Sequence, residues 1–339
     1  METKILNTDD AALAEAGQIL RDGGLVAFPT ETVYGLGADA YNADAVRSIY
    51  TAKGRPSDNP LIVHIADIAG LSGLTREISE GARALINAFM PGPFTIILKK
   101  SRTVPDAVTA GMDTVAIRFP ENETAQRLIK SAGVPIAAPS ANLSGKPSPT
   151  TAEHVKNDMT GRIAAIIDGG ACEVGVESTI VDASRSVPML LRPGGITFEM
   201  IQSVVPESEL DPNILRSLGE DEKPLCPGMK YKHYAPDAEV TVIEGDMRAV
   251  KREIEKRLGD NKNRRCGVLT MSDNAYDSAV IIHCGDTNRE YAKNLFASLR
   301  EFDRLGVETV FAEFENRDGY GLAIRNRLYK AAAQRVVRV

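Results

Sequence analysis

Residues 25–40, LVAFPTETVYGLGADA, decide the fold of the N-terminal half. The stretch opens with the apolar run Leu25–Phe28, which predicts a short buried strand. Hydroxyl side chains and one carboxylate follow at once, in the order Thr30, Glu31, Thr32 and Tyr34. Polar side chains directly behind a buried strand are typical of ligand sites in α/β sheets. The stretch therefore predicts an α/β fold with a site beside this strand.

The alternation of apolar runs and amphipathic stretches continues along the N-terminal half. The further predicted strands are Leu61–Ile65, Thr95–Leu98, Thr114–Arg118, Pro135–Ala138, Ala164–Ile167, Thr179–Val181 and Met189–Leu191. The predicted helices are Asp9–Arg21, with Thr8 as its N-cap, Ile78–Phe89, Thr124–Ala132 and Ala152–Met159. Apolar strands that alternate with helices predict a sheet whose faces are at least partly covered.

The periodic pattern stops at Pro206 and resumes only after Pro236, across a stretch with five prolines. A long connection without secondary structure is uncommon inside a compact protein and is often functional. Beyond it, the predicted strands are Val240–Ile243, Gly267–Thr270, Val280–His283 and Thr309–Phe314. The predicted helices there are Met247–Leu258, Arg289–Leu305 and Leu322–Ala333. This alternation predicts a small Rossmann-like domain.

Composition excludes several classes of protein. The 339 residues include 46 acidic and 40 basic side chains, a net charge of −6, and 43% are hydrophobic. This balance excludes disorder as the main state, and it argues against a protein whose main role is to bind nucleic acid. No stretch approaches the ~20 apolar residues of a membrane helix, and the N-terminus resembles no secretion signal, so we expect a cytoplasmic protein. Four cysteines without a CxxC pair give no support for a zinc or dithiol site.

Short motifs leave the function open. Residues 35–40, GLGADA, fit the dinucleotide fingerprint only loosely, because six residues separate them from the preceding strand. Arg118, Ser140, Asn142 and Arg192 fall at or just beyond predicted strand ends, where they suit a phosphate or carboxylate. A single loop cation is more often a solvated surface charge. The residues alone therefore predict a strand-end anion site without naming its ligand.

Several blocks of sequence together resemble one family. They are PTETVYGLGADA, KGRPSDNPLIVHI, PGPFTIILKK, TAGMDTVAIRFP, PIAAPSANLSGKPSPT, GVESTIVD and LRPGGI. In this order they resemble the Sua5/YrdC/YwlC family, and CPGMKYKHYAP at 226–236 is similar to the linker of its longer, Sua5-type members. The resemblance implies a YrdC-like twisted α/β catalytic domain over 8–202 and a linker over 203–237 that covers the active site. A smaller, Rossmann-like Sua5 domain would occupy 238–339.

The resemblance implies the activity of an L-threonylcarbamoyladenylate synthase, a nucleotidyltransferase. Such an enzyme converts L-threonine, bicarbonate and ATP to threonylcarbamoyl-AMP and pyrophosphate. A separate tRNA threonylcarbamoyl transferase complex then uses the product to form t6A37 in tRNAs that read ANN codons. Mg²⁺ is expected with the ATP phosphates, without a dedicated protein cage. The alternatives are a double-stranded RNA-binding module and a carbamoyltransferase; the net charge leaves room for weak RNA contact only, and no membrane partner is expected.

The family motifs also imply roles for individual residues. By resemblance, the catalytic set is Lys53, Arg55, Ser140 and Asn142. The implied L-threonine pocket consists of Thr32, His64, Arg118 and Ser178. The implied ATP contacts are Arg55, Asn59, Thr114, Ser140, Ser148, Arg192 and, from the linker, Tyr234, with Lys230, Lys232 and His233 adding positive charge. Many relatives have histidine at the position of Asn122, so this position receives no catalytic role.

Overall fold

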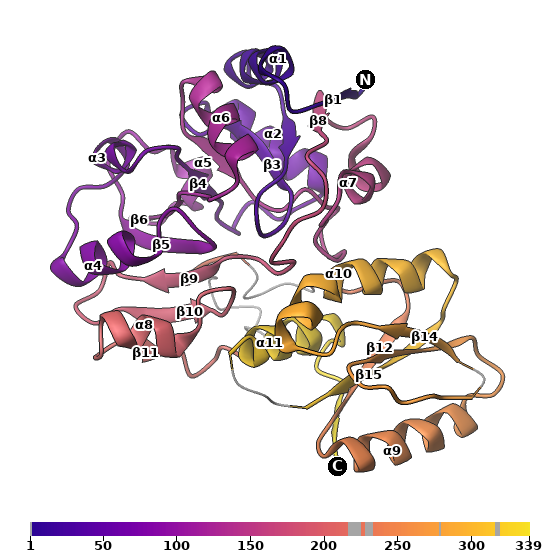
Figure 1. Ribbon diagram of the computed structural model, residues 1–339. Helices are drawn as coiled ribbons and strands as arrows, with labels where there is room; N and C mark the ends of the chain where they lie inside the picture. The colour runs from indigo at the N-terminus through magenta and orange to yellow at the C-terminus, as the bar shows by residue number, and fades with distance from the viewer. Residues whose placement is uncertain (1, 216–224, 228–232, 278, 316–318) are drawn as a thin grey trace. The chain divides into compact units, whose positions relative to one another are not determined.

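The computed structural model describes residues 2–215, 225–227, 233–277, 279–315 and 319–339. The described chain forms two compact units, drawn in Figure 1. Of the described residues, 2–144, 148–214 and 225–227 belong to the N-terminal unit. The C-terminal unit contains 145–147, 215, 233–277, 279–315 and 319–339. Within these ranges, no helix combines the length and the apolar character that crossing a membrane would take.

An eleven-stranded sheet forms the frame of the N-terminal unit. In spatial order its strands are β1 (Lys4–Leu6), β8 (Ala165–Ile167), β2 (Val26–Phe28), β3 (Gly35–Asp39), β7 (Ile136–Ala138), β4 (Ile62–His64), β6 (Thr114–Arg118), β5 (Phe94–Lys99), β9 (Thr179–Asp182), β10 (Met189–Arg192) and β11 (Glu209–Leu210). Every strand predicted in this half is present. The sequence did not predict β1, β3 and β11, and β11 extends the sheet past residue 202, the predicted end of the domain.

The sheet is mixed: β2 and β3 form an antiparallel hairpin, β3 is also antiparallel to β7, and β2 is parallel to β8. The loose fingerprint at 35–40 is therefore not a phosphate-binding turn, since most of it is strand β3. Its glycines allow close packing: a Cβ on Gly37 would lie 2.7 Å from Cγ2 of Ile136 and 3.0 Å from the Phe28 ring. Only glycine fits there without a shift of both neighbours.

Helices cover the sheet and bury its apolar residues. The main helices are α1 (Asp10–Arg21), α2 (Ala43–Lys53), α4 (Glu80–Phe89), α6 (Glu123–Ala132), α7 (Ala152–Met159) and α8 (Phe198–Val204), with short turns η1 (Ile68–Gly70), α3 (Leu71–Leu74) and α5 (Asp106–Thr109). Helices α1 and α6 share a buried cluster with β2, β7 and β8. The N-cap of α1 is Asp9 and not Thr8, because the Asp9 carboxylate reaches the backbone N–H of Ala12.

The C-terminal unit is a five-stranded, wholly parallel sheet, as the Rossmann-like prediction requires. The spatial order is β14 (Val280–His283), β13 (Cys266–Thr270), β15 (Thr309–Phe314), β12 (Glu239–Glu244) and β16 (Val336–Arg338). Helix α9 (Met247–Asp260) covers one face, and α10 (Asn288–Arg304) and α11 (Gly321–Ala331) cover the other (Figure 1). The sequence predicted all of these elements except β16, whose three residues are too few to show a period.

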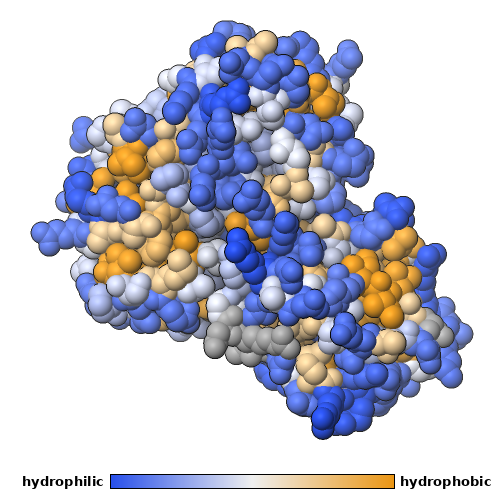
Figure 2. All heavy atoms as spheres, viewed as in Figure 1, coloured by the Kyte–Doolittle hydropathy of each residue, from blue (hydrophilic) through white to orange (hydrophobic). Residues whose placement is uncertain are grey.

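Hydrophobic side chains are mostly internal, and Figure 2 shows a largely hydrophilic face with smaller hydrophobic areas. One exposed apolar residue is Ile281, 40% exposed in the edge strand β14. All four cysteines are buried and free. The thiols therefore contribute to the packed interior, as isolated cysteines usually do.

Candidate functional site

Lys53, Ser140 and Asn142 lie together in the N-terminal unit. Lys53 is the last residue of α2, and its ammonium donates hydrogen bonds to the backbone carbonyls of Ser140 and Asn142. The Ser140 hydroxyl donates to Oδ1 of Asn142 at 2.5 Å. Lys53 is only 2% exposed, so these contacts hold a positive charge inside the protein. Three of the four predicted catalytic residues thus form one cluster.

Arg55 and Asn59 form a second contact just beyond α2. The Arg55 guanidinium donates to the carbonyl of Asn59 at 3.4 Å and to that of Pro60 at 3.2 Å. Asn59 is 1% exposed, and its Oδ1 atom is buried without a hydrogen-bond partner. A buried acceptor without a donor costs free energy. A ligand that supplies an N–H or O–H group would satisfy this oxygen.

Arg118 ends β6 and pairs across the sheet with His64 in β4 and Thr95 in β5. Its Nη2 atom donates to Oε1 of Glu31 at 2.7 Å, and both side chains are almost fully buried. Its Nε atom is buried and has no partner. Glu31 thus anchors one side of the guanidinium and leaves a donor for a ligand carboxylate. The sequence motifs indicated no such role for Glu31.

His64 is neutral at physiological pH. Burial lowers the pKa of His64 to about 3, and the nearby positive charge of Arg118 adds to the effect. Its Nδ1 lies 3.1 Å from the carbonyl of Ile62, and its ring meets the Phe28 ring edge-on at 5.9 Å. A neutral imidazole whose Nδ1 carries the proton donates to that carbonyl and leaves Nε2 as an acceptor. His64 therefore suits a donor on the ligand.

Arg192 and Ser178 also meet. The Arg192 guanidinium donates to the carbonyl of Ser178 at 3.0 Å, to its hydroxyl at 3.1 Å and to the carbonyl of Pro227 at 3.3 Å. The Ser178 hydroxyl lies 2.7 Å from that of Thr95. A residue assigned to threonine by resemblance and one assigned to ATP therefore share a hydrogen-bond network.

The predicted strand-end residues do not all follow strands that run in the same direction. His64 pairs with Ile136, at the start of β7, so the end of β7 that leads to Ser140 points away from the ends of β4 and β6. The reason is the antiparallel direction of β7, which the sequence did not reveal. Residues 31–35 connect the two ends, because Glu31 contacts Arg118 while Gly35 forms a bridge with Ser140. Four residues of chain span at most about 14 Å, so one extended ligand can reach both.

The other predicted site residues differ in their surroundings. Thr32 is fully buried, and its hydroxyl lies 2.9 Å from that of Thr30. The Ser148 hydroxyl donates to the carboxylate of Glu177, which is 6% exposed. The sequence motifs indicated no role for Glu177. Thr114 lies at the opposite end of β6 from Arg118, where it lines a cavity of about 430 Å³. The structure therefore does not bring Thr114 beside Arg118.

Tyr234 belongs to the C-terminal unit. It is 4% exposed and its ring stacks on Phe296 with 5.1 Å between centroids. The Arg327 guanidinium carbon lies 5.6 Å from the centre of the same ring. These contacts hold Tyr234 at φ 64°, a left-handed conformation that few side chains adopt. Its contact with ATP remains a prediction, and Lys230 and Lys232 lie outside the described residues.

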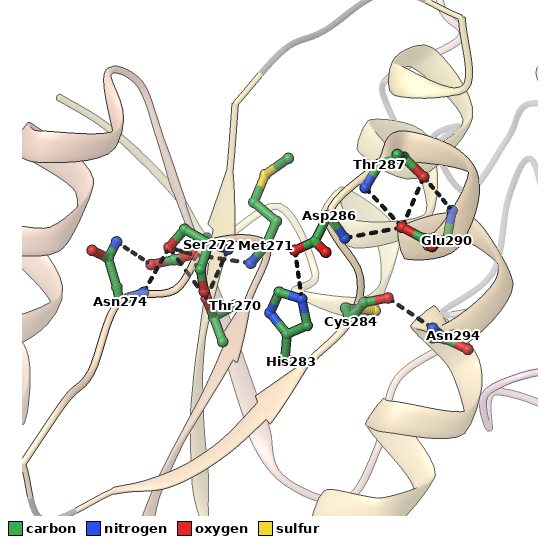
Figure 3. Close-up of polar contacts among 11 residues, drawn as sticks. Thr270, Met271, Ser272, Asn274, His283, Cys284, Asp286, Thr287, Glu290 and Asn294 are labelled. Atoms are coloured by element: carbon green, nitrogen blue, oxygen red, sulfur yellow. Dashed lines mark hydrogen bonds and ion pairs between the residues drawn. The ribbon is translucent and has the colours of Figure 1, made fainter.

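A second polar cluster lies at the carboxyl ends of β13 and β14 (Figure 3). The buried Glu313 carboxylate accepts hydrogen bonds from Thr270, the backbone of Met271, Ser272, Asn274 and Tyr276. Nearby, Thr287 and Glu290 form the capping box of α10. These bonds fix the loop after β13 and the start of α10. In the described residues, no group of three or more His, Cys, Asp or Glu side chains is placed to hold a metal ion.

Two family models match consecutive parts of the chain. A family model described as "Telomere recombination" (Sua5_yciO_yrdC) matches residues 18–194, and one described as "Threonylcarbamoyl-AMP synthase, C-terminal domain" matches 196–333. A threonylcarbamoyl-AMP synthase of Pyrococcus abyssi is 49% identical over 96% of this chain and 95% of its own length. One of Bacillus subtilis is 49% identical over 99% and 97%. The crystal structure of P. abyssi Sua5 complexed with L-threonine has a TM-score of 0.95 at 47% identity, and covers 99% of this chain and 100% of that chain.

Proposed function

The chain belongs to the Sua5/YrdC/YwlC family, in its long, threonylcarbamoyl-AMP synthase form, and we propose that its N-terminal unit makes threonylcarbamoyl-AMP. The substrates would be L-threonine, bicarbonate and ATP, with pyrophosphate released. The observation that carries the proposal is the buried Arg118, anchored on one side by Glu31 and with Nε lacking a partner. An amino-acid carboxylate is the ligand that this donor suits.

L-Threonine would bind around Arg118. Its α-carboxylate would accept from Nε of Arg118, and its amine would face the acceptor Nε2 of His64. Ser178 and Thr32 supply buried hydroxyls for the remaining polar groups of the amino acid. The P. abyssi relative solved with L-threonine supports an amino-acid pocket in this fold.

The reaction has two steps. The threonine amine and bicarbonate form an N-carboxylate and lose water. An oxygen of that carboxylate then attacks the α-phosphorus of ATP, and the bond from this phosphorus to the bridging oxygen of pyrophosphate breaks. Both reactants are anions, so their alignment and charge neutralisation dominate catalysis.

The buried cations Lys53 and Arg55 are suited to that task, because they are 2% and 9% exposed and lie inside a water-poor region. Ser140, Asn142, Asn59, Ser148 and Arg192 would add nucleotide contacts. Lys53 is held by carbonyl groups and has no covalent role in the proposal.

Mg²⁺ would accompany ATP. When bound, the cation neutralises charge on the leaving pyrophosphate. The residues present fit an ion carried by the substrate, since Ser140 and Asn142 offer only neutral oxygens. Mg²⁺ keeps much of its water and commonly binds substrate phosphates with few protein ligands. Removal of divalent cations with a chelator should stop pyrophosphate release, and added Mg²⁺ should restore it.

The product is a mixed anhydride that water hydrolyses, so it must be protected and passed on. We propose that the linker over 203–237, with Tyr234, covers the nucleotide during synthesis. A separate tRNA threonylcarbamoyl transferase complex would then receive the product for t6A37 formation. Deletion of residues 226–236 should increase product hydrolysis; unchanged turnover and hydrolysis would contradict the role of this linker.

The direct test measures pyrophosphate release from ATP by the full chain, with and without L-threonine and bicarbonate. We expect pyrophosphate release to require both L-threonine and bicarbonate. We also expect mass spectrometry to detect a product with the mass of threonylcarbamoyl-AMP. Arg118→Lys should lose most of the threonine-dependent rate, because an ammonium cannot hold Glu31 and a carboxylate in the same fork geometry. The matched control is Arg127→Lys, a surface arginine paired with Asp10 in the same unit. Threonine-independent release, or equal rates for both variants, would contradict the proposal.

A further inference from the structure

The outer face of α9 and the turn that follows it carry a surplus of positive charge. Residues 246–265 contain eight basic and four acidic side chains, a net charge of +4, although the whole chain has a net charge of −6. Val250 and Ile254 bury the apolar side of the helix in the core of the C-terminal unit. The charged side chains therefore face the solvent, where such a surplus attracts anions.

Three cations on this surface have no carboxylate that neutralises them. Arg248 and Arg252 are four residues apart, so they are neighbours on the helix, about 6 Å apart along its axis. Lys262 follows in the turn after the helix, and all three side chains are exposed. Among the described residues, no ion pair involves any of the three, whereas Glu253 pairs with Arg257 at 2.8 Å. Arg248, Arg252 and Lys262 together form what we call the α9 face.

A cavity of about 580 Å³ adjoins the α9 face at the C-terminal end of the helix. Its lining comes from the end of α9, the turn after it, the start of β13 and the loop that follows β13, and it includes Leu258, Gly259, Lys262, Arg264, Cys266 and Asp277. Lys262 thus belongs both to the α9 face and to the cavity. The volume lies in the range of small-molecule pockets, roughly 300–1,000 Å³, so a nucleobase can enter.

Exposed cations beside a cavity fit a polyanion that carries one flat group for each charge. Single-stranded nucleic acid has this chemistry, because its phosphates alternate with bases that can leave the stack. A membrane surface fits less well, since the apolar residues of α9 are already buried in the unit. We propose that the α9 face binds single-stranded RNA, with phosphates on Arg248, Arg252 and Lys262 and one unpaired base in the cavity. The choice of RNA rests on the proposed function, because the product is passed on to modify an adenosine in tRNA.

The test measures the salt dependence of RNA binding by the full chain, using fluorescence anisotropy and an unstructured RNA of about 12 nucleotides. One triple variant removes the α9 face: Arg248→Ala/Arg252→Ala/Lys262→Ala. The matched control removes three exposed cations of α10 instead, from the other face of the same sheet: Arg289→Ala/Lys293→Ala/Arg304→Ala. For a single strand, each phosphate contact adds about 0.7 to the slope of log affinity against log salt concentration. The slope should therefore fall by about 2 in the α9 variant and stay unchanged in the control.

The cavity is tested separately at Gly259. This glycine lines the cavity, and no neighbouring atom lies within 4 Å of the position that its Cβ would take. Gly259→Leu should therefore fill part of the cavity without disturbing the helix, and Gly259→Ala is its control. Wild type and Gly259→Ala should bind the single strand about tenfold more tightly than the same RNA annealed to its complement, the effect of one bound base. Gly259→Leu should lose this preference and keep the salt slope.

Several outcomes would overturn the inference. They are equal slopes for the two triple variants, and equal affinity for the duplex, for DNA of the same sequence or for poly-glutamate. If the α9 triple variant does not fold, Arg252→Gln alone should lower the slope by about 0.7. Threonine-dependent pyrophosphate release without RNA binding would refute this inference alone. RNA binding by a folded protein that releases no pyrophosphate would refute the proposed function alone.

Discussion

Acidification from pH 7 to pH 5 should destabilise the N-terminal unit through His64. The side chain is 3% exposed, and burial holds its pKa at about 3, against 6.5 for the free side chain. Between these values the unfolded chain binds a proton that the folded unit does not. Stability is therefore fully present above pH 6.5 and decreases as the pH falls toward 3.

The size of the effect follows from the two pKa values. At pH 5 the unfolded imidazole is almost fully protonated, while the folded one is almost fully neutral. The difference costs roughly 2 kcal/mol of unfolding free energy relative to pH 7. Asparagine at this position can keep a donor for the Ile62 carbonyl and does not titrate, so His64→Asn should lose that part of the pH dependence.

Urea unfolding at pH 7 and pH 5, followed by a probe in the N-terminal unit, measures the difference for wild type and His64→Asn. His283→Asn is the control, because this histidine is largely exposed in the other unit. NMR titration gives a direct check, since the chain has only four histidines. A His64 ring signal that titrates near pH 6.5, or equal pH dependence in wild type and His64→Asn, would refute the reasoning.

Three further predictions concern buried groups. Glu31→Gln should lower the unfolding free energy by about 3 kcal/mol in denaturant titration, because it leaves the buried charge of Arg118 without its anion. Burial raises the pKa of the Cys172 thiol to about 12. At pH 8 this thiol should therefore react with a thiol reagent about a thousandfold more slowly than in the unfolded chain, because the thiolate is the reactive form. Mass spectrometry of peptides from the labelled protein measures the rate. Gly194→Ala would place a Cβ 2.5 Å from backbone atoms and should lower the unfolding free energy by about 1–3 kcal/mol in denaturant titration. Gly259→Ala in α9, with open space around it, is the control and should not lower the unfolding free energy.

The strands were predictable because their signal is local. A run such as Leu61–Ile65 has no polar side chain before His64, and it becomes β4 with one residue fewer at each end. Strand β3 was missed for a local reason too. Its glycines are typical of turns, and here they are required by contacts with Phe28 and Ile136, which come from other strands.

The candidate site was predictable as a set of residues and not as a geometry. The motifs named Lys53, Ser140 and Asn142, which the structure brings into contact. They did not show that Glu31 anchors Arg118, because that pairing joins residues 87 positions apart. The sequence contains many basic side chains with which the Glu31 carboxylate could pair. Only the folded sheet shows that Arg118 is the one beside it.

Overall charge was a poor guide to this site for the same reason. The chain carries a net charge of −6, yet Lys53, Arg55, Arg118 and Arg192 are each 9% exposed or less in the N-terminal unit. Most charged side chains lie at the surface, where water and salt weaken their fields. A few buried cations act in a less polar medium, where each has a stronger effect on a nearby anion. The sum over the sequence therefore describes the solvated surface, while the ligand chemistry depends on a few residues that this sum conceals.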